Sequence, residues 1–130
     1  MGLKIPKVMI AAVKSGSGKT TITCAFLKQL LCRKKHPVSF KCGPDYIDPM
    51  FHEQVLKIPS KNLDTFFSDV SQIQALYEME LPGHDIAVLE GVMGLYDGLG
   101  GIREEGSSYH LARTLDVPVI LVVDAHGMGK

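Results

Sequence analysis

The sequence predicts an α/β domain in which helices flank a mainly parallel β-sheet. Short apolar segments alternate with segments of helical periodicity along the 130 residues. The apolar segments hold few charges, as expected for parallel strands that are buried on both faces. Strands that alternate with helices are typical of right-handed strand–helix–strand units, whose ligands bind at the carboxyl ends of the strands.

The first strand is predicted at residues 7–12, and a helix follows over residues 20–32. Apolar residues three to four positions apart mark the face of this helix that is expected to be buried. These residues are Ile22, Phe26, Leu27, Leu30 and Leu31. The basic residues 33–35 oppose the negative end of the helix dipole, and Pro37 is expected to end the helix. Residues 38–41 form the second predicted strand.

Residues 42–67 are predicted to be rich in turns, because this stretch holds three prolines. Asp69 then begins a second helix, with Gln72 as its partner in a capping box. Pro82 ends this helix. Its apolar face is predicted to contain Val70, Ile73, Leu76 and Tyr77.

The rest of the chain repeats the same pattern. A third strand is predicted at residues 85–90, a glycine-rich segment at 91–106, a short helix at 108–115 and a fourth strand at 119–123. The sequence ends soon after this buried-looking strand. We therefore expect the chain to be the incomplete N-terminal portion of a longer protein.

The composition is that of a globular domain, with 45% hydrophobic and 22% charged residues. Lys and Arg balance Asp and Glu at 14 each, so we expect neither nucleic acid nor a membrane surface as a partner. No apolar run is long enough to cross a bilayer. Cys24, Cys32 and Cys42 fit no zinc ribbon or CxxC pair, and free thiols indicate a cytoplasmic protein.

A phosphate-binding loop is predicted between the first strand and the first helix. The pattern GxxxxGK[ST] is matched at Gly18, Lys19 and Thr20, although Val13 stands where the first glycine belongs. Glycines let several N–H groups face one anion, Lys19 can reach the β- and γ-phosphates, and the Thr20 hydroxyl can ligate magnesium. The predicted nucleotide-binding residues are Lys14, Ser15, Gly16, Ser17, Gly18, Lys19, Thr20 and Thr21.

Two other interpretations of this segment stay open. It could be a glycine-rich turn with a chance lysine, or it could bind a phosphorylated ligand that is not a nucleotide. Lys14 resembles the signature lysine of the deviant Walker A group, which includes chromosome-partitioning and septum-positioning ATPases. In those proteins the lysine crosses a dimer interface to the neighbour's phosphates, whereas a solvated loop lysine is the alternative here. This resemblance implies a second hypothesis, a homodimeric ATPase that acts as a nucleotide-controlled dimerisation or positioning switch.

Acidic residues follow two predicted strands. Asp45 and Asp48 lie on a loop that Pro49 stiffens, where they could bind magnesium or merely cap turns. Glu90 ends an apolar strand, as the Walker B carboxylate does, although a strand can also end in an ordinary acid. Asp97 lies in the glycine-rich segment, which either approaches a ligand or forms a mobile lid.

Taken together, the motifs closely resemble those of cobyrinate a,c-diamide synthases. The matching blocks are the phosphate-binding loop and residues 41–52, 62–66, 90–101, 106–108 and 118–124, which cover nearly the whole chain. The block Gly-Pro-Asp-Tyr-Ile-Asp-Pro is specific, because dethiobiotin synthetase lacks it and cobyric acid synthase carries a different sequence there. The resemblance implies an ATP- and Mg²⁺-binding P-loop NTPase-like domain at residues 1–130, with a C-terminal glutamine amidotransferase domain that is absent from this chain.

The resemblance also implies the reaction and the roles of individual residues. ATP would phosphorylate the a- and c-side-chain carboxylates of a corrinoid, and ammonia from a glutaminase domain would then form the amides. Cobyrinate, hydrogenobyrinate and a nickel tetrapyrrole precursor stay open as the substrate. The implied catalytic residues are Lys19, Asp45, Asp48 and Glu90, the metal ligands are Thr20, Asp48 and Glu90, and the substrate contacts are Tyr46 and Asp97.

Overall fold

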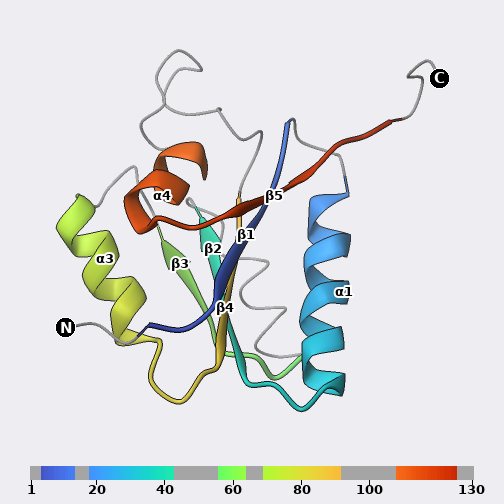
Figure 1. The fold of residues 1–130 in the computed structure, drawn as a ribbon, viewed down its shortest axis with the longest axis horizontal. Coiled ribbons are helices and arrows are strands. Elements are labelled where there is room, and N and C mark those ends of the chain that lie inside the picture. Colours follow the sequence, from blue (N-terminus) through green and yellow to red (C-terminus); the bar gives the residue numbers. More distant parts are fainter. Residues whose placement is uncertain (1–3, 14–17, 43–55, 64–68, 92–107, 126–130) are drawn as a thin grey trace.

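A computed structural model describes residues 4–13, 18–42, 56–63, 69–91 and 108–125. They form a parallel sheet of five strands in the order β3-β2-β4-β1-β5, with helices on both faces (Figure 1). The elements are β1 (Lys7–Ala12), α1 (Lys19–Cys32), β2 (Pro37–Cys42), β3 (Ser60–Leu63), α3 (Val70–Met79), β4 (Ile86–Glu90), α4 (Ser108–Leu115) and β5 (Val119–Val122). The predicted α/β fold class is therefore confirmed.

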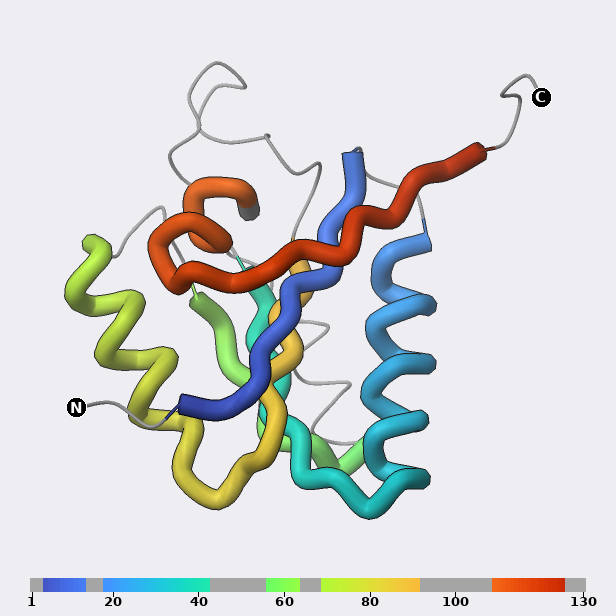
Figure 2. Tube along the Cα trace, viewed as in Figure 1, coloured from blue at the N-terminus to red at the C-terminus, as the bar shows by residue number. Residues whose placement is uncertain are grey.

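The apolar side chains form two separate cores, one on each face of the sheet. Helix α1 covers one face, where Leu27 packs with Ile10 and Val88. Helices α3 and α4 cover the other face, where Phe40 and Leu89 belong to the larger core (Figures 1 and 2). Because side chains alternate along a strand, neighbouring residues of β1 and β4 belong to different cores.

Helix α1 buries a narrower stripe than its sequence suggests. Thr23 and Leu27 are fully buried, whereas Ile22 and Leu31 are 43% and 37% exposed. The prediction that these two residues face the core is wrong. At 3.6 residues per turn, Ile22 lies about 120° and Leu31 about 60° from the midpoint between Thr23 and Leu27, on opposite flanks of the buried stripe.

A left-handed residue ends α1 well before Pro37. Lys34 has φ 61°, and its N–H donates to the carbonyl of Leu31 at 2.9 Å, while the N–H of Lys35 donates to Leu30 at 3.0 Å. This pair of hydrogen bonds is the Schellman arrangement, which satisfies the last carbonyls of a helix. Pro37 is the first residue of β2 and does not stop the helix.

Strand β3 lies inside the stretch that was expected to consist of turns. Its residues pair with β2 from Ser39 opposite Ser60 to Cys42 opposite Leu63. The structure therefore corrects the prediction for residues 60–63. Residues 43–55 and 64–68 of the same stretch lie outside the described part of the chain.

The second predicted helix begins as expected. The carboxylate of Asp69 accepts a hydrogen bond from the Gln72 N–H at 2.8 Å, and the Gln72 side chain accepts one from the Asp69 N–H at 3.0 Å. This reciprocal pair confirms the capping box. Ile73 and Tyr77 are buried, but Val70 and Leu76 are exposed, so only half of the predicted apolar face contacts the core.

Strand β5 is not buried as the sequence suggests. It pairs with β1, and among the described residues no further strand pairs with its other edge. Val119, Ile120 and Leu121 are consequently exposed, while Val122 packs in the core. None of the helices in the described ranges has the length and apolar character that a membrane span requires.

Candidate functional site

A left-handed glycine begins α1 directly after the first strand. Gly18 has φ 86° and ψ 15°, and a Cβ built there would meet nothing within 4 Å. The backbone conformation, rather than crowding, therefore calls for glycine at this position. Within the described part of the chain, no side chain caps this end of α1, and the first turn of the helix holds no acidic residue. The N–H groups and the positive end of the helix dipole suit an anion.

Parallel pairing brings the carboxyl ends of the central strands to the same edge of the sheet. Glu90, the last residue of β4, lies in register with Ile10 of β1 on one side and with Lys41 of β2 on the other. Phe40 and Leu89 point into the core beneath α3 and α4. The alternating positions Lys41 and Glu90 therefore face α1, next to the helix start that holds Lys19.

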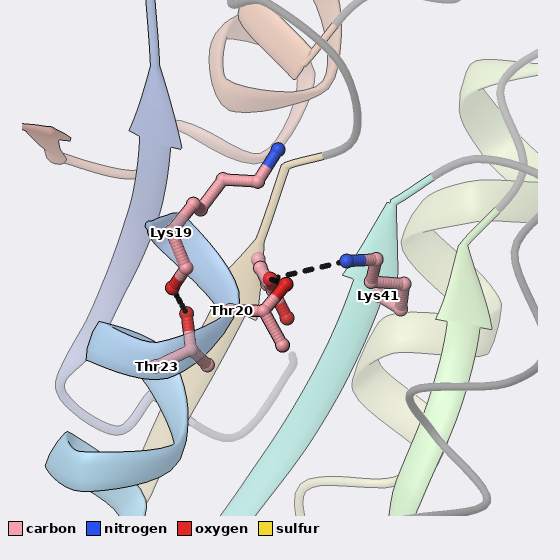
Figure 3. A network of polar contacts seen from close by, with 5 residues as sticks. Lys19, Thr20, Thr23 and Lys41 are labelled. Carbon is pink, nitrogen blue, oxygen red and sulfur yellow. Dashed lines mark hydrogen bonds and ion pairs between the residues drawn. The ribbon is translucent and has the colours of Figure 1, made fainter. Parts of the chain in front are cut away.

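Three side chains from three elements meet at one carboxylate oxygen (Figure 3). The Lys41 ammonium lies 3.1 Å from Oε1 of Glu90, and the Thr20 hydroxyl donates a hydrogen bond to the same oxygen at 3.0 Å. Glu90 is completely buried, and the side chain of Lys41 is 4% exposed. A buried carboxylate needs such compensation, because transfer of an unpaired charge from water into a protein interior costs several kcal/mol.

The second oxygen of the same carboxylate has no partner. Oε2 of Glu90 is shielded from solvent, and no donor reaches it in the part of the chain that the structure describes. Buried polar atoms are rarely left without a hydrogen bond, and exceptions indicate strain, catalysis or a bound ion. The Glu90 side chain thus has one saturated oxygen and one available oxygen.

Lys19 is the first residue of α1 and is half-buried. The Thr23 hydroxyl donates to the Lys19 carbonyl at 2.9 Å, which ties the first turn together. In Figure 3 the Lys19 side chain extends away from Thr23, so its ammonium lies beyond the first turn of the helix. This direction leaves the ammonium at the carboxyl edge of the sheet, where a phosphate group would bind.

The Cys42 thiol is buried next to Lys41 at the end of β2. Burial raises the pKa of the Cys42 thiol above its ordinary value, and the nearby cations of Lys41 and Lys19 oppose this effect without cancelling it. The thiol therefore stays protonated at neutral pH, and a thiol is a poor nucleophile compared with a thiolate. None of Cys24, Cys32 and Cys42, all of which the structure describes, forms a disulfide bond, as the sequence predicts.

The structure describes five of the predicted site residues: Gly18, Lys19, Thr20, Thr21 and Glu90. Thr20 and Glu90 are in contact, whereas Thr21 is exposed on the first turn of α1. The predicted residues that lie outside the described part of the chain are Lys14, Ser15, Gly16, Ser17, Asp45, Tyr46, Asp48 and Asp97.

The sequence reasoning gave no role to Lys41, although it lies at the centre of the site. A signal was present, because Lys41 ends a predicted strand with an otherwise apolar environment. A lysine placed there must be buried with a counter-ion or must end outside the sheet. The same argument applies to Glu90 at the end of another predicted apolar strand, so the two residues could have been paired.

The donors present fit a magnesium ion. Mg²⁺ prefers hard oxygen ligands, and both the unpartnered Oε2 of Glu90 and the Thr20 hydroxyl are of this kind. Among the described residues, no group of three or more His, Cys, Asp or Glu side chains gathers as a metal site. A metal here would therefore take the Glu90 carboxylate and the Thr20 hydroxyl from the described residues and its remaining ligands from elsewhere.

The fold and the site are those of nucleotide-binding domains, which hold phosphate groups at a glycine-rich turn between a parallel strand and a helix. Residues 8–124 match the family described as the CobQ/CobB/MinD/ParA nucleotide binding domain. The chain belongs to this family. This match agrees with the observed sheet and identifies the domain as nucleotide-binding.

Curated relatives confirm the resemblance drawn from the motifs. The chain is 49% identical over 122 residues to the cobyrinate a,c-diamide synthase of Gloeobacter violaceus. The aligned residues cover 94% of this chain and 27% of that relative. The chain is 43% identical over 126 residues to that of Thermoplasma acidophilum, covering 97% of this chain and 28% of the relative. For Listeria monocytogenes the identity is 45% over 119 residues, with 91% and 26% covered. The chain thus spans about a quarter of the length of these relatives.

Proposed function

We propose that this chain is the ATP-binding domain of an amide synthase that activates carboxylates of a corrinoid. The observation that carries the proposal is the meeting of Thr20, at the start of α1, with the buried Glu90 at the end of β4. The arrangement resembles the metal site of P-loop enzymes, in which a threonine hydroxyl and a strand-end acid hold the nucleotide's magnesium. The name shared by the relatives supplies the substrate class.

The reaction needs ATP, because ammonia cannot displace oxide or hydroxide from a carboxylate. In the first step, a side-chain carboxylate oxygen attacks the γ-phosphorus, the bond to the β-phosphate oxygen breaks, and ADP leaves. In the second step, ammonia attacks the carbonyl carbon of the acyl phosphate, inorganic phosphate leaves with the bonding electrons, and the nitrogen loses a proton. Two such cycles would convert the a- and c-carboxylates into amides.

The residues of this chain would act in the first step mainly by position and charge. The Gly18 turn and the amides of α1 would hold the phosphate chain, and the Lys19 ammonium would offset the charge on the γ-phosphate. Thr20, Glu90 and Asp48 are the proposed ligands of Mg²⁺, which would neutralise phosphate charge when bound. Asp48, like the proposed catalytic residue Asp45, lies outside the described residues.

We further propose that the ammonia comes from a separate glutamine-hydrolysing domain. The relatives are several times longer than this chain and so have room for such a domain. The buried and protonated Cys42 thiol makes this residue unsuited to act as the nucleophile of glutamine hydrolysis. Tyr46 and Asp97 remain proposed contacts to the corrinoid.

Replacement of the phosphate-binding lysine tests the proposal. In the full-length protein we expect Lys19→Ala to lower ATP-dependent amidation by at least about 100-fold, because one preorganised charge on the transferred phosphoryl group is lost. Lys28→Ala is the matched control, since Lys28 is exposed on the same helix. Near wild-type turnover of the Lys19 variant would exclude the proposed role.

A second assay separates the ligase from an ATPase switch. Hydroxylamine converts an acyl phosphate into a stable hydroxamate. Incubation of the full-length protein with ATP, a corrinoid polycarboxylate and hydroxylamine should therefore yield a hydroxamate. We expect ATP consumption to depend on the polycarboxylate. ATP hydrolysis at the same rate without it would instead favour a switch protein.

A further inference from the structure

We infer that Lys41 is a positioning residue of the proposed nucleotide site, one that holds Glu90 through Oε1 and thereby presents Oε2 to the metal of the nucleotide. The inference rests on the proposed function, because it assigns a role toward the magnesium of bound ATP. It concerns a residue of β2, a strand that is separate in sequence from the phosphate-binding turn.

The first support is burial. Among the described residues, Lys41 and Glu90 are the charged side chains that are almost completely buried. A lysine is almost never found in this position without a counter-ion, because its charge is strongly hydrated in water. Glu90 supplies that counter-ion at 3.1 Å. The pair is therefore a specific arrangement and not a chance contact between surface side chains.

The second support is the register of the sheet. Lys41 and Glu90 are direct partners on adjacent strands, so their Cα atoms lie at the same height along the sheet. Side chains of direct partners on one face project together. The ion pair is thus fixed by the backbone pairing of β2 with β4, which leaves the carboxylate little freedom to turn.

The third support is the division of the two carboxylate oxygens. Both Lys41 and Thr20 contact Oε1, whereas Oε2 has no partner among the described residues. A purely structural ion pair is expected to satisfy both oxygens, because a buried unsatisfied acceptor is costly. The observed division instead resembles the outer-shell contacts that orient metal ligands.

The test measures nucleotide binding with and without magnesium in the full chain by isothermal titration calorimetry. We expect Lys41→Met to weaken binding of Mg·ATP by about 10- to 100-fold, as the loss of outer-shell partners does in metal sites. Binding of ATP in EDTA should be unchanged, because the phosphate-binding turn is intact. Lys61→Met is the matched control, since Lys61 is exposed on the neighbouring strand β3.

Two further variants keep the test decisive if Lys41→Met does not fold. Lys41→Arg keeps a cation and should retain more of the magnesium-dependent affinity than the methionine variant. The double variant K41M/E90Q removes both charges, and its Mg·ATP affinity should equal that of Glu90→Gln alone, because Lys41 acts only through Glu90. A further loss in the double variant would overturn the inference, since Lys41 would then contact the nucleotide itself.

Failure of the inference differs from failure of the proposed function. If the wild-type chain binds no ATP under either condition, the proposed function is wrong and the inference fails with it. If the wild-type chain binds Mg·ATP and Lys41→Met binds it equally well, the proposed function stands and Lys41 has no positioning role. Equal weakening with magnesium and with EDTA would also overturn the inference, because the effect would not pass through the metal.

Discussion

Neutralising Glu90 should destabilise the domain far more than removing both members of its ion pair. Glu90→Gln keeps the shape of the side chain but leaves the ammonium of Lys41 buried without a counter-charge. At 3.1 Å and an effective dielectric constant of about 20, the lost attraction is about 5 kcal/mol. Removal of one partner from a buried pair typically costs about 3–5 kcal/mol, so we expect a loss in this range.

The double variant K41M/E90Q should recover most of that loss. It buries no net charge, and replacement of a whole buried ion pair by neutral groups is often close to neutral in stability. The coupling energy between the two sites should therefore be at least about 3 kcal/mol. Because the pair is buried, added salt should screen this coupling only weakly.

Urea unfolding followed by circular dichroism measures these differences. A loss of about 3–5 kcal/mol corresponds to a fall in the melting temperature of about 10–20 °C for a domain of this size. Lys61→Met, on the exposed face of β3, serves as the control for removal of a lysine. A loss below about 1 kcal/mol for Glu90→Gln would refute the reasoning, because such values are typical of solvated pairs.

Three other predictions follow from the caps and the buried ionisable groups. Asp69→Ala should lower the free energy of unfolding by about 1 kcal/mol, because α3 loses its capping box; an unchanged urea midpoint would contradict this. Iodoacetamide at pH 8 should modify the exposed Cys32 and leave Cys42 unmodified, as peptide mass spectrometry can measure; rapid labelling of Cys42 in the folded protein would disprove its burial. Burial raises the pKa of Tyr77 to about 12, so its proton stabilises the folded state, and this contribution is lost as the pH rises from 10 to 12. Tyr77→Phe should therefore lose less stability than the wild type over that range, and equal losses in pH-dependent unfolding would show that Tyr77 does not titrate as expected.

The sequence predicts well those strands whose own residues form an apolar run, whatever strand they pair with. Residues 7–12 form an apolar run before a glycine-rich turn, and β1 has these bounds. Strand β3 has a single strongly apolar residue, Leu63, and could not be predicted in this way. Its residues are extended because they pair with the edge of β2 through backbone hydrogen bonds. This pairing depends on the sheet and not on the local sequence.

The helices show a similar division between local and tertiary information. The capping box at Asp69 was predictable because it involves residues three positions apart in the chain. The exposure of Ile22 was not, since an apolar stripe predicts a buried face but not how the helix is rotated against its sheet. Rotation depends on the side chains that the sheet presents, such as Ile10 and Val88 beneath α1.

The candidate site depends most on the order of the strands. Residues Gly18, Lys19 and Thr20 indicate a phosphate-binding turn from local sequence alone, but their meeting with Glu90 requires β4 to lie beside β1. Glu90 is 70 positions away from Thr20 in the chain, so no local sequence pattern could predict their contact. The sequence therefore predicts the types of residue at the site, whereas their distances come from the topology.

The position of β4 between β1 and β2 also explains how a carboxylate can be buried there with partners. At the edge of the sheet, Glu90 would be solvated and would need no ammonium beside it. In the interior, β4 lies between β1, which precedes the helix that carries Thr20, and β2, which carries Lys41. The helix after β1 supplies the Thr20 hydroxyl, which a metal can share, and β2 supplies the Lys41 ammonium, which pairs with the carboxylate. The strand order thus creates both the cost of burying this acid and the two contacts that offset it.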